Sequence, residues 1–78
     1  MKSVKVLGSG CRNCVTTARL IEERAGALGV PVEVDKVTDV AAIMGYGVMR
    51  TPGVVVDGTV VHAGGVPAAA AVDTWLKG

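Results

Sequence analysis

The chain has 78 residues and a formal net charge of +1, from eight basic and seven acidic side chains. This length allows one small domain over residues 1–78, and the balanced charge offers no basic stripe that would neutralise a nucleic-acid backbone. Half of the residues are apolar, but 26 of them are Val or Ala, so the core must be thin, which favours helices packed on a sheet. Because no apolar run is long enough for a signal peptide or a membrane span, we expect a cytoplasmic protein without nucleic-acid or membrane partners.

The apolar pattern of the first half predicts a strand, a helix and a second strand. Residues 4–7 indicate a short strand, which the following Gly-Ser-Gly ends. Over residues 11–28, apolar side chains recur at steps of three and four, as on one face of a helix: Cys14, Ala18, Ile21, Ala25 and Leu28. Residues 30–34 alternate between Val and other residues, as in a half-buried strand. Because a helix connects these two strands, we expect them to be parallel.

The second half predicts a short helix, a hairpin and a closing helix. Thr38 is the expected cap of a helix that runs to Met44. Asp57–Gly58 suits the two-residue type I′ turn between strands at residues 54–56 and 59–61. A last helix over residues 67–76 is expected to bury Val72, Trp75 and Leu76. The expected order is therefore β-α-β-α-β-β-α, an α/β sandwich.

Two cysteines, Cys11 and Cys14, are the residues with the clearest chemical potential. Three positions apart, they close too small a loop to stabilise a fold, which leaves a reactive dithiol or half of a metal site. Cys11 falls where a strand passes into a helix, so the helix N-terminus and the charge of Arg12 favour its thiolate form. Cys14 lies one turn further, on the core-facing side. An exposed thiolate and a buried partner are what disulfide exchange requires.

Thr51–Pro52 stands directly before the predicted third strand. A proline there is either an ordinary strand-entry residue or part of a cis peptide bond. A cis bond would leave the backbone of Thr51 free to pair with an extended chain bound next to it.

Three motifs follow one another along the chain: GSGCRNC at a helix start, YGVMRTPG before a Val-rich hairpin, and Gly64–Gly65 before a last helix. In this order they resemble the motifs of the small thioredoxin-like redox-active disulfide proteins. These are glutaredoxin-sized members of the thioredoxin superfamily. The resemblance covers nearly the whole chain and implies a thioredoxin-like fold, with a four-stranded mixed sheet flanked by three helices. It also implies that Cys11 is the nucleophile, Cys14 the resolving thiol and Pro52 the cis-proline beside them, while Thr51 contacts the substrate backbone. We expect Arg12 to contribute to substrate binding.

The expected function is therefore thiol–disulfide oxidoreductase activity on a disulfide-containing protein or small molecule. An upstream reductase or thiol donor would return the electrons, and we expect a monomer that needs no cofactor and no metal. The main alternative is a soft-metal carrier that holds Cu(I) or Zn(II) with the same two thiolates. Carriers of that kind end on a strand, whereas this chain ends on a predicted helix. A thioredoxin-like adaptor without turnover is a third interpretation, and the presence of both cysteines counts against it.

The remaining candidate side chains have structural interpretations. We expect His62 to be a surface or hydrogen-bonded strand histidine rather than a catalytic base. Met44 and Met49 are expected to fill gaps in the packing around the second helix, and Trp75 to anchor the core.

Overall fold

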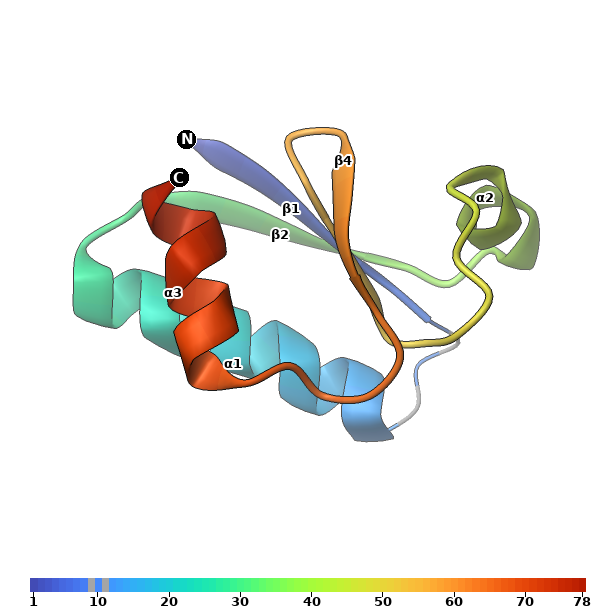
Figure 1. The fold of residues 1–78 in the computed structure, drawn as a ribbon, viewed down its shortest axis with the longest axis horizontal. Helices are drawn as coiled ribbons and strands as arrows, with labels where there is room; N and C mark the ends of the chain where they lie inside the picture. Colours follow the sequence, from blue (N-terminus) through green and yellow to red (C-terminus); the bar gives the residue numbers. More distant parts are fainter. Residues whose placement is uncertain (9, 11) are drawn as a thin grey trace.

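A computed structural model describes residues 1–8, 10 and 12–78. Along these residues the order of elements is the predicted β-α-β-α-β-β-α (Figure 1). The bounds are β1 (Lys2–Leu7), α1 (Arg12–Leu28), β2 (Val32–Val37), α2 (Val40–Gly45), β3 (Gly53–Val56), β4 (Thr59–Ala63) and α3 (Ala69–Lys77). Within this described part of the chain, no helix is long and apolar enough to cross a membrane.

The strands form a four-stranded mixed sheet in the order β2-β1-β3-β4. β1 pairs in parallel with β2, as predicted, and antiparallel with β3, while β3 and β4 form the antiparallel hairpin. β2 begins and ends later than the predicted residues 30–34 because it follows the length of β1, from Lys2 opposite Val32 to Leu7 opposite Val37. Pro31 lies just before this ladder, where its carbonyl accepts a hydrogen bond from the Lys2 amide at 3.1 Å.

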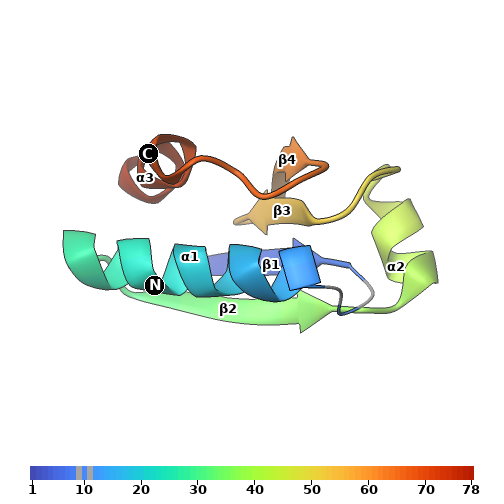
Figure 2. The ribbon, with the colours of Figure 1, turned by 90° about the horizontal axis from the view of Figure 1, so that it is seen from below.

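The alternation of side chains along the central strands divides the core between the two faces of the sheet. One face packs against α1 and α3, which lie side by side (Figures 1 and 2). Its strand residues are Val4, Val6, Val54 and Val56. On the other face, Leu7 and Val55 pack with Ile43 of α2 and with Val48. The helices therefore cover both faces, as the thioredoxin-like architecture requires.

Two helix starts differ from the prediction. α2 is capped by Asp39 and not by Thr38: the Asp39 carboxylate accepts a hydrogen bond from the Ala41 amide at 3.2 Å. α3 begins at Ala69, two residues after Pro67, because Ala68 still has an extended backbone and its carbonyl accepts the first helical hydrogen bonds. The inward face predicted for α1 is confirmed from Cys14 to Ala25, and the sequence pattern missed one further buried residue, Thr17.

An ion pair that the sequence did not reveal joins the two helices on one face. Arg24 of α1 donates two hydrogen bonds to Asp73 of α3, from Nε to Oδ1 at 2.6 Å and from its terminal nitrogen to Oδ2 at 2.9 Å. Hydrogen bonding from Arg24 lowers the pKa of the Asp73 carboxyl. The pair links α3 to α1 beside the buried contacts of Val72 and Leu76.

Candidate functional site

The first turn of α1 carries two of the predicted site residues, Arg12 and Cys14. Cys14 is the third residue of this helix and is 5% exposed, within the core cluster between the sheet, α1 and α3. Its predicted core-facing position is confirmed. Arg12 is exposed at the helix start, and in the sequence it lies within the cysteine motif, directly after Cys11. Cys11, the predicted nucleophile, lies outside the described residues.

Gly8 brings the end of β1 into contact with both Cys14 and Thr51. A methyl group on its Cα would overlap the Cys14 Sγ, and would lie 3.3 Å from the Cys14 Cβ and 3.6 Å from the Thr51 Cβ. The Thr51–Pro52 peptide bond is cis, the isomer implied by the resemblance. Pro52 is buried and Thr51 is exposed. Cys14 and Thr51, separated by 37 residues in the sequence, therefore meet at one end of the sheet across a glycine.

The loop after β4 supports the other side of Pro52. The Gly64 amide donates a hydrogen bond to the Pro52 carbonyl at 3.0 Å. Gly64 has a φ of +88°, and a side chain there would approach the Cβ of Arg50 at 3.2 Å. Two features thus require glycine here: a left-handed backbone and the stem of Arg50 lying against it.

His62 holds the same loop to the end of the sheet. Its Nε2 lies 2.9 Å from the Gly65 carbonyl oxygen, and because a carbonyl can only accept, Nε2 carries the proton. The imidazole also lies beside the Trp75 ring, with 5.8 Å between the centroids. The prediction of a hydrogen-bonded strand histidine is confirmed.

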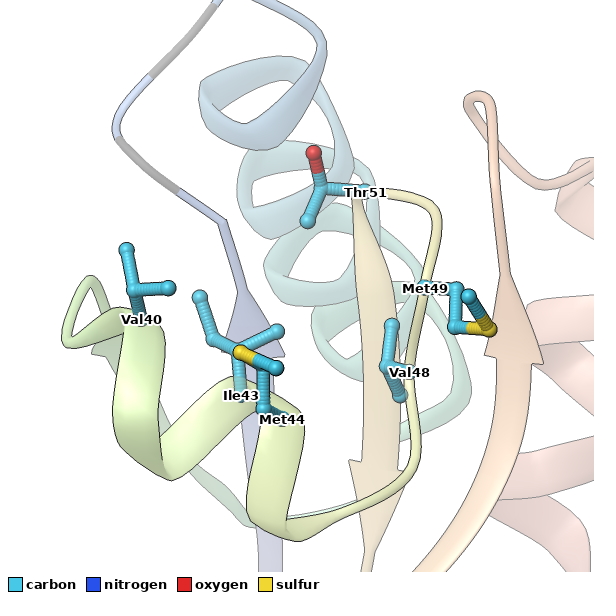
Figure 3. A pocket seen from close by; sticks show the side chains of 6 residues that line it. All are labelled: Val40, Ile43, Met44, Val48, Met49 and Thr51. Atoms are coloured by element: carbon cyan, nitrogen blue, oxygen red, sulfur yellow. The ribbon is translucent and has the colours of Figure 1, made fainter.

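An apolar hollow of about 350 Å³ lies next to Thr51, between α2 and the segment that leads into β3 (Figure 3). Its lining residues are Val40, Ile43, Met44, Val48, Met49 and Thr51. The interpretation of Met44 and Met49 as gap fillers is wrong, because Met44 is 69% exposed and Met49 is 96% exposed. Sequence reasoning missed this hollow, although two methionines within the seven residues before Thr51 were the available signal.

The charged side chains of the segments that converge here are positive. Arg12 and Arg50 are both exposed, and the described residues of the converging segments (8, 10, 12–14, 48–53 and 62–65) include no Asp or Glu. Within the described part of the chain there is also no group of three or more His, Cys, Asp or Glu side chains placed to hold a metal ion.

Comparison with known proteins identifies the family to which this arrangement belongs. The sequence model of the thioredoxin-domain family matches residues 2–77 of the chain. The chain belongs to the thioredoxin family. It is 34% identical to a thioredoxin of Methanocaldococcus jannaschii over 77 residues, which cover 99% of this chain and 88% of that protein. It is 31% identical to a thioredoxin of Methanothermobacter thermautotrophicus over 58 residues, which cover 74% of this chain and 75% of that protein. Membership of the thioredoxin family supports thiol–disulfide oxidoreductase activity in general terms.

Proposed function

We propose that this thioredoxin-family chain reduces disulfide bonds by dithiol–disulfide exchange, with Cys11 as the nucleophile and Cys14 as the resolving thiol. The observation that carries the proposal is the position of Cys14. It is buried in the first turn of α1, at the point where Gly8 and the exposed Thr51 converge. Cys11 directly precedes this helix in the sequence, and we assign to it the reactive thiol that exchange needs beside a buried partner.

The proposed reaction has two exchange steps. The Cys11 thiolate attacks one sulfur of the substrate, the substrate S–S bond breaks, and a mixed disulfide with Cys11 forms as the other substrate sulfur leaves as a thiolate. The Cys14 thiolate then attacks the Cys11 sulfur, so the mixed disulfide breaks, a Cys11–Cys14 disulfide forms and the second substrate thiolate leaves. Both leaving thiolates take up protons. The substrate gains two electrons and two protons, which the two cysteine thiols lose.

Three further residues take part in this proposal. The helix N-terminus and the adjacent Arg12 favour the thiolate of Cys11, and Arg12 is exposed and can also meet an anionic substrate group. Thr51 is exposed next to Cys14, which suits a backbone contact with an extended substrate segment. Pro52, buried and hydrogen-bonded through its carbonyl to Gly64, holds Thr51 in place.

The oxidised chain must be reduced again, and we propose that an upstream reductase or a thiol donor supplies the two electrons. A dithiol that works as a reductant suits the cytoplasm, where thiols are kept reduced. The substrates are disulfides of proteins or small molecules, and we propose that the chain acts as a monomer and binds neither nucleic acid nor a membrane.

Reduction of insulin disulfides with dithiothreitol as the electron source tests this function. We expect the wild-type chain to accelerate insulin precipitation and Cys11→Ser to have no activity above the uncatalysed rate, with both chains equally folded by circular dichroism. Activity that survives in Cys11→Ser would contradict the assigned nucleophile. Titration of the reduced chain with Zn(II) and Cu(I) tests the alternative function: tight metal binding without any disulfide exchange would indicate a metal carrier instead.

A further inference from the structure

The apolar hollow beside Thr51 is lined by large apolar side chains that remain exposed to solvent. Val40 is 62% exposed, and it lines the hollow together with the exposed side chains of Met44 and Met49. Ile43 and Val48 form its buried floor. Figure 3 shows these side chains on α2 and on the segment before β3, with Thr51 at the end nearest α1. Methionine side chains are flexible and polarizable, and they suit contacts with varied apolar groups.

Arg50 directly precedes Thr51 but does not line the hollow, and its side chain lies against the loop after β4. The stem of its side chain lies along Gly64, so that a methyl group there would approach its Cβ and its Cδ at 3.2 and 3.3 Å. This contact orients the stem while the residue stays exposed. Because the described residues of the converging segments carry no carboxylate, an acidic group from outside the chain would be complementary in charge to this exposed guanidinium group.

The geometry of an extended chain connects these two features. Side chains at alternate positions of an extended segment point to the same side and are about 7 Å apart. Consider a substrate segment that binds across Thr51 with its cysteine facing the dithiol motif. The residues two positions before and two positions after that cysteine then also point toward the surface of this chain around Thr51. In this arrangement one of them would face the hollow and the other would face Arg50.

We propose that the hollow and Arg50 form a docking surface that selects disulfide substrates of a particular kind. The occupant is an extended segment of a substrate protein, with a large apolar side chain two positions to one side of its disulfide-bonded cysteine and an acidic side chain two positions to the other. This inference deepens the proposed function and rests on it. It assigns the substrate preference to Met44, Met49 and Arg50, which have no part in the exchange steps.

Synthetic peptides of seven residues test this preference. Each has a central cysteine as its mixed disulfide with thionitrobenzoate, alanine elsewhere, and two variable positions that hold Leu or Ser and Glu or Gln, in both orders. Release of thionitrobenzoate by the reduced chain gives kcat/KM for each peptide. In the better order, we expect Leu to exceed Ser by about tenfold, from partial burial of the leucine side chain. We expect Glu to exceed Gln by about threefold at low salt, with the ratio falling as salt is added.

Variants separate the two contacts. In Met44→Gln/Met49→Gln the ratio of Leu to Ser peptides should fall close to one, while the preference for Glu remains. In Arg50→Gln the ratio of Glu to Gln peptides should fall close to one, while the preference for Leu remains. Val60→Ser, an exposed apolar residue on β4, and Lys77→Gln, a cation at the far end of α3, are the matched controls and should keep both preferences.

Each other outcome has a definite meaning. Equal kcat/KM values for all peptides, or preferences that persist in the variants, would overturn the docking surface. If sedimentation showed a wild-type dimer that Met44→Gln/Met49→Gln converts to a monomer, the hollow would be a dimer interface and the proposal would be wrong. Hydroxyethyl disulfide is small and uncharged, so its reduction tests the proposed disulfide exchange independently of the docking surface. Failure of the wild-type chain to reduce it or any peptide would contradict the proposed function itself.

Discussion

The Cα of Gly8 faces the Cys14 sulfur so closely that no side chain can be added at position 8. The requirement is one of space, because the backbone of Gly8 does not have a left-handed conformation. The same absent side chain leaves room for both Cys14 and Thr51 beside Gly8, since the Cβ of Thr51 would be 3.6 Å from an added methyl group. A glycine at the end of β1 is thus part of how the fold brings these two residues together.

Gly8→Ala should therefore destabilise the protein by about 1–3 kcal/mol, the usual cost of overpacking a tight interior. The measurement is the free energy of unfolding in urea. Gly26→Ala is the matched control, since an added methyl group in this part of α1 meets no atom within 4 Å. The control should stabilise by about 0.5–1 kcal/mol, because alanine is the better helix former.

A double-mutant cycle shows whether the Cys14 sulfur is the cause. In a Cys14→Ala background the overlapping atom is gone, so Gly8→Ala should cost less free energy of unfolding than it does in the wild-type chain. Equal costs in the two backgrounds would mean that another contact determines the effect.

The ion pair between Arg24 and Asp73 predicts a pH-dependent stability. Hydrogen bonding from Arg24 lowers the pKa of Asp73 in the folded state. The resulting stabilisation is therefore complete above the unfolded pKa of about 4 and is lost as the pH falls through the lower, folded value. Asp73→Asn should lower the Tm at neutral pH and have a progressively smaller effect below about pH 4.

Thermal unfolding followed by circular dichroism over this pH range gives the comparison. Asp35→Asn on β2 removes the same charge from an exposed position and serves as the control. A Tm difference between Asp73→Asn and the wild-type chain that is the same at neutral and acidic pH would refute the assignment.

Much of the fold could be predicted because local signals agree with the tertiary structure. The α1 face from Cys14 to Ala25 follows helical spacing, and Asp57–Gly58 forms the predicted turn, with φ values of +48° and +85°. The start of α2 was misplaced by one residue because Thr38 and Asp39 are both good capping residues. In the structure Asp39 is the capping residue, because its carboxylate accepts a hydrogen bond from the Ala41 amide.

Only the site residues that belong to a recognisable sequence motif could be predicted. The cysteines and Thr51–Pro52 stand out by residue type and order. The ion pair between Arg24 and Asp73 spans 49 residues of sequence, and no local pattern indicates it. The exposure of Met44 and Met49 was missed because apolar residue type predicts burial. In this chain the space beneath α2 is already filled by Ile43 and Val48, which leaves both methionines at the surface.

The hairpin turn makes a third prediction. Asp57 has a left-handed backbone, and its Oδ1 accepts a hydrogen bond from the Ser3 amide at 2.9 Å. Asp57→Ala removes this acceptor and places an unfavourable residue in the turn, so it should cost about 1–2 kcal/mol in the free energy of unfolding. Asp57→Asn should cost less, because asparagine tolerates the conformation and its carbonyl oxygen can accept the same bond. Urea unfolding of both variants checks the order, and an equal loss would contradict it.

The most direct test of the two cysteine roles follows the mixed disulfide. Reduced Cys14→Ser and Cys11→Ser chains, each mixed with hydroxyethyl disulfide, are analysed by intact-mass spectrometry over time. We expect Cys14→Ser to accumulate rapidly an adduct of one hydroxyethylthiol group on Cys11, which it cannot resolve. The buried Cys14 of the Cys11→Ser chain should react far more slowly. Equally fast adduct formation on Cys14, or continued turnover by Cys14→Ser, would contradict the division of roles between the two cysteines.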